Sequence, residues 1–323
     1  MYILPFEANY FSDAAALWTL KLKSLRRQQP MIPEAFTQPQ RLIEKLEYLQ
    51  AHNHLLMAVK DGQLLGYLGW YLVEQFRGTR RKAAYVPEWG HFATEDYKTA
   101  VYRVLYRIAS QQWTASGCEA HAITLLADDP SVEKSFFWSG FGLIVIDAIR
   151  TLDPISTVPS DGLTIRPATP EDAEAYCQLD EEHCRHYTQP PIFMPLKQAD
   201  DPQKLHQFLI KPLNRLWLAL DENIPVGYMR FDAYDFDCTE IIQDENVIGI
   251  NGAYVRPAYR GRHVAANLLS AGINEYRQLG FASCAVDFES INPEAADFWP
   301  RYFSPVCHSL LRIPEQLDPT GSS

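Results

Sequence analysis

The sequence lacks the apolar runs that membranes and export signals require. No stretch of about 18 uncharged apolar residues occurs among its 323 residues, which argues against a transmembrane helix. Residues 1–13 show neither a basic start followed by an apolar stretch nor an arginine-rich amphipathic pattern. We therefore expect a cytoplasmic protein without a membrane partner.

Several common chemical motifs are also missing. The six cysteines include no Cys-x-x-Cys pair, which is typical of reduced thiols. Two histidine pairs, His52 with His54 and His183 with His186, have no further ligands at metal-site spacing, so no metal is predicted. Gly-x-x-x-x-Gly-Lys-Ser/Thr, Gly-x-Gly-x-x-Gly after a strand and Gly-x-Ser-x-Gly do not occur. Nucleotide hydrolysis, dinucleotide redox chemistry and serine hydrolysis are thereby disfavoured.

Positive charge is scarce in the C-terminal half. Residues 1–159 hold 16 Lys and Arg and 16 Asp and Glu, whereas residues 160–323 hold 13 and 24. The net charge of −11 therefore lies in the second half. Such a field disfavours nucleic acid and anionic membranes as partners and favours a cationic partner.

The length suggests two domains. Residues 153–162, rich in Pro, Ser and Asp, interrupt the apolar periodicity and indicate a linker. We predict a mixed α/β chain of two tandem domains, each with a mixed, mostly antiparallel sheet flanked by helices. The domains are residues 1–152 and 163–316, followed by a tail at 317–323.

The C-terminal half predicts the order β-α-ββ-β-α-β-α-β. Its expected strands are 163–167, 216–220, 225–231, 247–255, 282–288 and 306–313. The N-terminal half repeats this order less cleanly, with helices expected at 13–26, 40–51, 97–113 and 131–139. Two copies of one architecture explain this repetition better than one large domain.

The segment from Ala253 to Leu269 carries the clearest chemical signal. It runs from a strand, through a turn containing Arg260, Gly261 and Arg262, into an amphipathic helix. Backbone N–H groups and the positive end of a helix converge there. This arrangement predicts an anion site, most naturally for phosphate.

These residues resemble the GCN5-related N-acetyltransferase (GNAT) superfamily, whose pyrophosphate loop has the form Arg/Gln-x-x-Gly-x-Gly/Ala. Arg260 and Ala265 match its first and last positions, and the opening at 165–169 and the Asn292 to Trp299 segment also fit. The resemblance implies acetyl-CoA as co-substrate, no metal, and a small-molecule or peptide amine as acceptor. The cofactor-binding residues that it implies are Tyr254, Val255, Arg260, Gly261, Arg262, His263, Val264, Ala265 and Asn292.

The sequence departs from the family at two positions. His263 stands where the family usually has glycine, either as a side chain that points to solvent or as an extra donor to a phosphate. Trp299 stands where the family has the tyrosine that protonates the leaving thiolate. Tyr302, one turn further on, is the substitute acid or, equally, a core aromatic residue.

The general base is less well defined. Glu289 at a strand end and Glu240 in a connection are the candidates, acting directly or through water. The acidic cluster either attracts a cationic amine or is a solvated loop; its members are Asp232, Asp235, Asp237 and Glu240. Segments 188–205 and 231–246 are expected to form loops around the acceptor pocket.

The N-terminal half keeps the scaffold but lacks the loop. Residues 86–96 contain no arginine and carry Glu88, Glu95 and Asp96, which would repel a pyrophosphate. We interpret residues 1–152 as a degenerate copy that binds no CoA. The predicted function is acetyl transfer from acetyl-CoA to a primary amine; the alternative is a non-catalytic CoA-binding or scaffolding protein.

Overall fold

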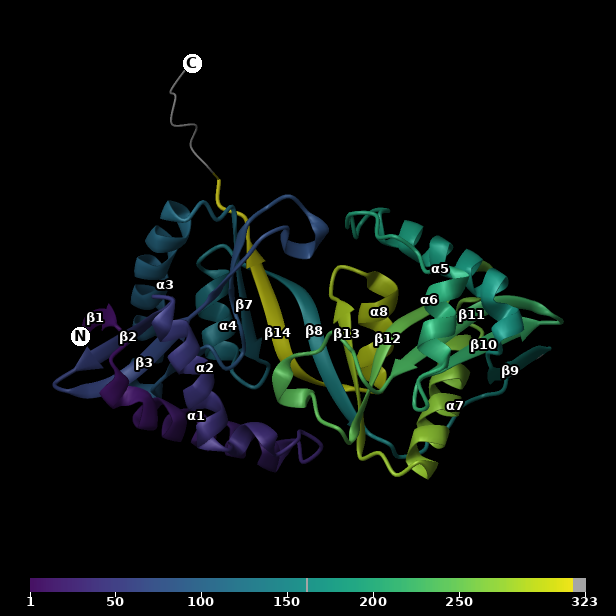
Figure 1. Ribbon diagram of the computed structural model, residues 1–323, viewed down its shortest axis with the longest axis horizontal. Helices are drawn as coiled ribbons and strands as arrows, with labels where there is room; N and C mark the ends of the chain where they lie inside the picture. Colours follow the sequence, from purple (N-terminus) through teal and green to yellow (C-terminus); the bar gives the residue numbers. More distant parts are fainter. Residues whose placement is uncertain (161, 316–323) are drawn as a thin grey trace, which may run out of the picture. The chain divides into compact units, whose positions relative to one another are not determined.

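The computed structural model describes residues 1–160 and 162–315. They form two compact units, unit 1 from residues 1–146 and 306–315 and unit 2 from residues 147–305 (Figure 1). The predicted tail, 317–323, lies outside the described residues. No helix among them combines the length and apolarity that a membrane crossing needs.

Unit 2 has the mixed, mostly antiparallel sheet that the sequence predicts. Its strands are β9 (Leu163–Pro167), β10 (Arg215–Asp221), β11 (Ile224–Asp232), β12 (Val247–Val255) and β13 (Ser283–Glu289). They are ordered β13-β12-β11-β10-β9, with β12 and β13 parallel and the other neighbours antiparallel. Its helices are α5 (Ala173–Tyr187), α6 (Pro202–Leu209), α7 (Val264–Gln278) and α8 (Pro293–Phe298).

Helix α6 corrects one expectation, since it occupies the end of the segment predicted as a loop, 188–205. The Asp201 carboxylate accepts the Lys204 N–H at 2.8 Å, and Pro202 occupies the first turn. A capping acid and a proline at this position start a helix even in a short segment.

Helices cover both faces of the unit 2 sheet (Figure 1). On one face, Phe231 of β11 lies against α7 so closely that a Cβ on Gly272 would meet its ring at 2.2 Å. On the other face, Tyr228 of β11 packs edge-on against Tyr176 of α5, with ring centroids 5.0 Å apart. Large side chains from alternate faces of one strand therefore hold both helix layers.

Unit 1 is also mixed α/β. Its strands are β1 (Tyr2–Pro5), β2 (Leu55–Lys60), β3 (Gln63–Gly69), β4 (Tyr71–Val73), β5 (Ala83–Val86), β6 (His91–Ala93), β7 (Ala120–Leu126), the first part of β8 (Gly142–Thr151) and most of β14 (Ser304–Arg312). Its helices are α1 (Phe11–Gln28), α2 (Pro39–Ala51), α3 (Lys98–Ala115) and α4 (Pro130–Phe137). The sequence analysis predicted the short strand β5 at 83–86 but missed β1 and β6.

The last strand of the chain belongs to unit 1, which differs from the domain predicted at 163–316. Strand β14 pairs antiparallel with β7, from Cys307 opposite Leu126 to Arg312 opposite His121. Leu310 is fully buried in the hydrophobic core of unit 1. Burial of its apolar side chains fixes this strand in unit 1, although it follows the C-terminal half in sequence.

Candidate functional site

A wedge opens between two parallel strands of unit 2. Strands β12 and β13 pair from Val247 opposite Ser283 to Ile250 opposite Val286, and both continue for several residues without further pairing to each other. Strand β12 instead stays with β11, and a bulge opposite Arg230 and Phe231 marks the point of separation. The bulge bends β12 away from its parallel neighbour.

Backbone groups of β12 face this wedge. The Arg256 N–H donates to Val226 O at 2.9 Å, so this residue faces β11. Because backbone polar groups alternate along a strand, the N–H of Val255 faces away from β11 and toward the wedge. The neighbouring Tyr254 is 8% exposed, and its ring stacks on His183 with centroids 5.4 Å apart.

A short loop joins β12 to α7. A 3₁₀ turn at Pro257–Tyr259 is followed by Arg260–His263, and α7 begins at Val264. Gly261 and His263 both have positive φ, +76° and 62°. The Asn267 N–H donates to His263 O at 3.0 Å, and the N–H groups of the first turn before it have no acceptor within the helix. These donors and the helix dipole form a cradle suited to an anion.

Arg260 fastens this loop to its surroundings. Its Nε donates to Val255 O at 3.1 Å, and its Nη1 pairs with the Glu294 carboxylate at the start of α8. The guanidinium also lies 5.9 Å from the Tyr254 ring centroid. The partner Glu294 escaped the sequence analysis, because surface acids at helix starts are common. Arg260 therefore shapes the cradle while its charge is partly balanced.

The segment predicted as a linker braces the same loop. Asn267 of α7 donates from Nδ2 to Val158 O and to Ser160 Oγ, both at 2.9 Å. Ser160 in turn donates to Arg262 O at 2.8 Å. The exposed His263 follows directly. These bonds hold the backbone of the cradle without using its helix-terminal N–H groups.

A carboxylate lies where the two strands part. Asp287 is the first residue of β13 beyond the paired segment, and it is partly exposed. Burial, with the negative charges of Asp237 and Glu289, raises the pKa of Asp287 to about 7. The sequence analysis singled out Glu289, which is 9% exposed, and missed Asp287. The sequence signal that could have indicated Asp287 was one acidic residue within the apolar run from Cys284 to Phe288.

The acidic residues that follow β11 act in two different ways. The Asp232 carboxylate accepts the N–H groups of Tyr234 and Asp235 at 2.9 and 3.1 Å and so shapes the loop. Phe236 lies on β12, since a Cβ on Gly249 would come within 2.1 Å of its ring. This packing places Asp237 beside Asp287. Glu240 lies further along, in a 3₁₀ turn at Glu240–Ile242.

Helix α5 contributes His183 to the site. The Tyr228 hydroxyl donates to Asp180 Oδ1 at 2.8 Å and also lies 2.8 Å from His183 Nδ1. His183 Nδ1 must therefore donate, which leaves its Nε2 as an acceptor. Burial, helped by nearby positive groups, lowers the pKa of His183 to about 3.

Tyr187 and Asn292 complete the group around Asp287. The Asn292 side chain hydrogen-bonds to Tyr187, whose pKa is raised to about 12 by burial and by the charges of Glu289 and Asp287. Asn292 is 6% exposed, and its Oδ1 has no hydrogen-bond partner. Such a buried acceptor favours a ligand that can donate a hydrogen bond.

Tyr302 lies apart from that group in its contacts. It follows the 3₁₀ turn Trp299–Arg301, and its ring packs on Phe298 with centroids 5.1 Å apart. Trp299 is buried at 6% exposure. The ring contact fits a packing role, and the hydroxyl role predicted for Tyr302 stays a prediction.

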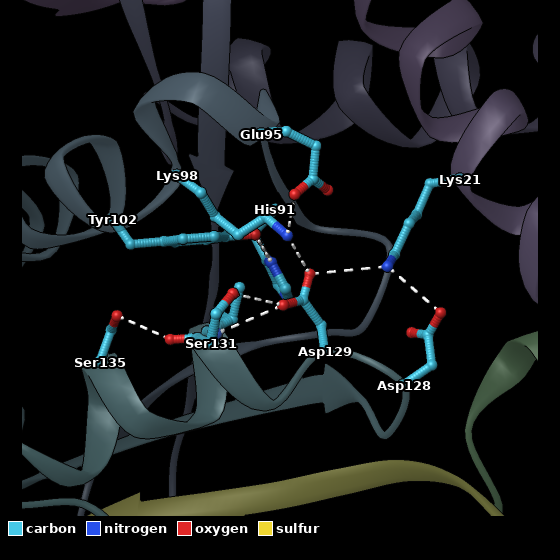
Figure 2. A network of polar contacts seen from close by, with 10 residues as sticks. Lys21, His91, Glu95, Lys98, Tyr102, Asp128, Asp129, Ser131 and Ser135 are labelled. Carbon is cyan, nitrogen blue, oxygen red and sulfur yellow. Dashed lines mark hydrogen bonds and ion pairs between the residues drawn. The ribbon is translucent and has the colours of Figure 1, made fainter.

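Unit 1 has a comparable separation of strands, which a network of polar side chains bridges (Figure 2), and a cavity there is lined by Lys21, His91, Tyr102 and Asp129. Strand β5 pairs parallel with β7, and after a turn the chain continues as β6, which pairs with β3. His91 of β6 bridges the gap, with Nε2 2.9 Å from Thr124 O and Nδ1 2.7 Å from the Tyr102 hydroxyl. Lys98 at the start of α3 pairs with Glu95 and with Asp129 at 2.8 and 2.7 Å.

A family model matches part of unit 2. Residues 178–303 match the model described as the acetyltransferase (GNAT) family. None of the curated proteins matches the chain. The fold is similar to that of a GCN5-related N-acetyltransferase from Sphaerobacter thermophilus, at 15% identity and a TM-score of 0.60, covering 99% of this chain and 98% of that one. It is also similar to a GCN5-related glucosamine N-acetyltransferase region of a fungal multi-domain β-N-acetylglucosaminidase, at 14% identity and a TM-score of 0.51, covering 96% and 38%.

Proposed function

We propose that this protein transfers the acetyl group of acetyl-CoA to a primary amine, because residues 178–303 match the acetyltransferase (GNAT) family model and the chain is similar in fold to a GCN5-related N-acetyltransferase. The observation that carries the proposal is the wedge between β12 and β13, which opens directly beside the donor cradle of Arg260–His263. A thioester with a pyrophosphate at its far end requires both features.

Each part of the co-substrate has a matching group in unit 2. The backbone of Val255, which faces the wedge, would hold the pantetheine arm or the thioester carbonyl, with the side chain of Tyr254 beside it. The backbone N–H groups of Gly261 to Ala265 would hold the pyrophosphate, with Arg260 fixing the loop. Asn292 would bind near the reacting end through its unpartnered Oδ1. Oriented N–H donors bind phosphate oxygens at little cost, because the fold has already ordered them.

The acceptor would be a small-molecule or peptide amine. Carboxylates gather beside the wedge at Asp237, Asp287 and Glu289, and such a field attracts an ammonium group. Glu289 and Tyr302 are the sequence-predicted base and acid of this reaction. The fungal relative is described as a glucosamine N-acetyltransferase, so we include glucosamine among the amines to test.

Acetyl-CoA binding tests the cradle. Gly261 has a φ of +76°, which a β-branched residue adopts only with strain of about 1–3 kcal/mol. We expect Gly261→Val to lower acetyl-CoA affinity about 10-fold or more, measured by calorimetry. Gly280→Val is a matched control, because Gly280 also has positive φ and open surroundings but ends α7 at its other end. Equal affinity of the two folded variants would refute the cradle.

Turnover tests the transfer. We expect CoA release from acetyl-CoA with at least one amine among glucosamine, spermidine and a lysine peptide. Tyr302→Phe should then lower turnover about 10²-fold with little change in acetyl-CoA affinity, the loss expected of a general acid. Tight acetyl-CoA binding without transfer to any amine would instead support the non-catalytic, CoA-binding alternative.

A further inference from the structure

Asp287 occupies the apex of the wedge between β12 and β13. The parallel pairing ends at Ile250 opposite Val286, and Asp287 is the next residue on β13. Its counterpart on β12, Asn251, lies in the bulge and donates from Nδ2 to Asp232 Oδ2 at 3.2 Å. The strands therefore leave a gap in their pairing at Asp287, whose side chain keeps some solvent exposure.

The groups that face Asp287 come from four segments. They are Asp237 and Cys238 after β11, Glu289 on β13, Lys197 after α5, and Tyr187 on α5. Two carboxylates oppose one ammonium group, so the local field favours a bound proton on Asp287. The field also favours a cationic amine in the gap, where the orphaned Asn292 Oδ1 could accept a hydrogen bond from it.

We propose that Asp287, rather than Glu289, is the catalytic base that takes the proton from the acceptor amine. This inference rests on the proposed function. Glu289 then acts on Asp287 as a neighbouring charge. Asp237 also acts on Asp287 as a neighbouring charge. The packing of Phe236 on Gly249 holds the loop that carries it.

The reaction balances with this assignment. The acceptor enters as an ammonium ion, and the Asp287 carboxylate takes one proton from it. The free amine attacks the thioester carbonyl, a C–N bond forms, and the C–S bond breaks. The acid of the site protonates the departing CoA thiolate, and the second proton that the nitrogen loses restores this acid. Products are the amide, CoA thiol and the proton that Asp287 later releases to water.

The proton affinity of Asp287 suits this role better than that of His183. A general base works best when its pKa lies near the operating pH. Burial first, and then Asp237 and Glu289, raise the pKa of Asp287 to about 7, whereas burial lowers that of His183 to about 3. Because only ionised Asp287 accepts a proton, turnover should rise with pH through about 7 and level off above it.

The test compares pH profiles of kcat/KM for the amine that the wild-type protein acetylates best. We expect Asp287→Asn to lower kcat/KM about 10²–10⁴-fold at pH 8. It should also abolish the limb of the profile, which is the rise of kcat/KM with pH near 7. Its acetyl-CoA affinity, measured by calorimetry, should be unchanged. Glu289→Gln and Asp237→Asn each remove a negative neighbour of Asp287. They should keep the limb and move it to lower pH.

Three outcomes would overturn the assignment. They are a wild-type limb in Asp287→Asn, a loss of less than 10-fold in that variant, or loss of the limb in Glu289→Gln. A second readout does not depend on activity: ¹³C NMR of labelled carboxyl groups should show one group that titrates near neutral pH and disappears in Asp287→Asn. If this group is present and no amine is acetylated, the proposed function fails and the role of Asp287 fails with it.

Discussion

The two halves of the chain build the same wedge and use it differently. In unit 2, β12 leaves β13 after Ile250, and Asp287, the next residue of β13, is partly exposed. In unit 1, β5 leaves its partner β7 after Val86, and His91 on the following strand bridges the gap to Thr124 O. One scaffold thus separates the strands in both units, and the side chains beside the separation differ, with Asp287 in unit 2 and His91 with Tyr102 in unit 1.

The turns that follow differ in length. In unit 2, four residues, Arg260–His263, separate the 3₁₀ turn from α7. In unit 1, the 3₁₀ turn Glu95–Tyr97 runs directly into α3 at Lys98, so no residue is left to form a loop. The sequence analysis attributed the loss of phosphate binding to Glu88, Glu95 and Asp96. Glu88 is in fact 1% exposed and lies before β6, so the missing loop is the stronger reason.

Lys98, at the start of α3, is held in ion pairs with other side chains. The Lys98 side chain is 11% exposed and pairs with Glu95 and Asp129, and Lys21 lies 3.5 Å from the same Asp129 carboxylate (Figure 2). Releasing this lysine for a phosphate would take one of two cations from the Asp129 carboxylate, whose side chain is only 12% exposed, which is costly. Phosphate binding at this fold therefore depends on a few loop residues with available backbone donors.

The largest expected difference between the halves is in ligand number. We expect native mass spectrometry of the intact chain to show one bound acetyl-CoA, because within residues 1–160 and 162–315 we find such a cradle at the turn of unit 2 alone. Gly261→Val should reduce this number toward zero. Lys98→Met, which removes the only cation we identify at the start of α3, should leave it at one. A second bound molecule, or a loss of binding in Lys98→Met alone, would contradict the comparison.

A smaller effect tests which half the last strand belongs to. Leu310 of β14 is fully buried in the core of unit 1, and truncation of a buried leucine typically costs about 2–5 kcal/mol. We expect Leu310→Ala to lower the free energy of unfolding by that amount in urea titrations. Ile313→Ala is the control, since Ile313 is 51% exposed and should change stability by no more than about 0.5 kcal/mol. Equal stabilities would place Leu310 outside the core.

The same strand shows what the sequence could predict. Its alternation and the turn before it sufficed to predict a strand at 306–313, and the structure has β14 at Ser304–Arg312. Its partner could not be predicted, because β7 lies about 180 residues earlier and a period of two carries no information on pairing. Local pattern therefore fixed the element but not the unit to which it belongs.

The candidate site also has a part that the sequence could predict and a part that it could not. The cradle was predictable, because Arg260 to Ala265 form a continuous motif with a clear mechanism. Asp287 was not, because its significance comes from the end of strand pairing and from the charges of Asp237 and Glu289. Glu289 lies further along β13, whereas Asp237 lies in the loop after β11, which is distant in sequence. Motifs within one segment are visible in a sequence, whereas environments assembled from several segments are not.

The smallest expected effect concerns the residue that departs from the family loop. His263 has a φ of 62°, a conformation that glycine adopts freely and that costs other residues about 1–2 kcal/mol. We expect His263→Gly to stabilise the protein by about 1 kcal/mol or less, because the relief of strain is partly offset by the greater freedom of glycine in the unfolded chain. Since the imidazole is exposed, acetyl-CoA affinity should be unchanged. His263→Asn, which tolerates positive φ and keeps a hydrogen-bond donor, is the matched variant. Thermal unfolding measures the stability, and calorimetry measures the acetyl-CoA affinity. A tenfold loss of affinity in His263→Gly that His263→Asn restores would show instead that the side chain donates to a phosphate, and that unit 2 compensates for its missing glycine with a new contact.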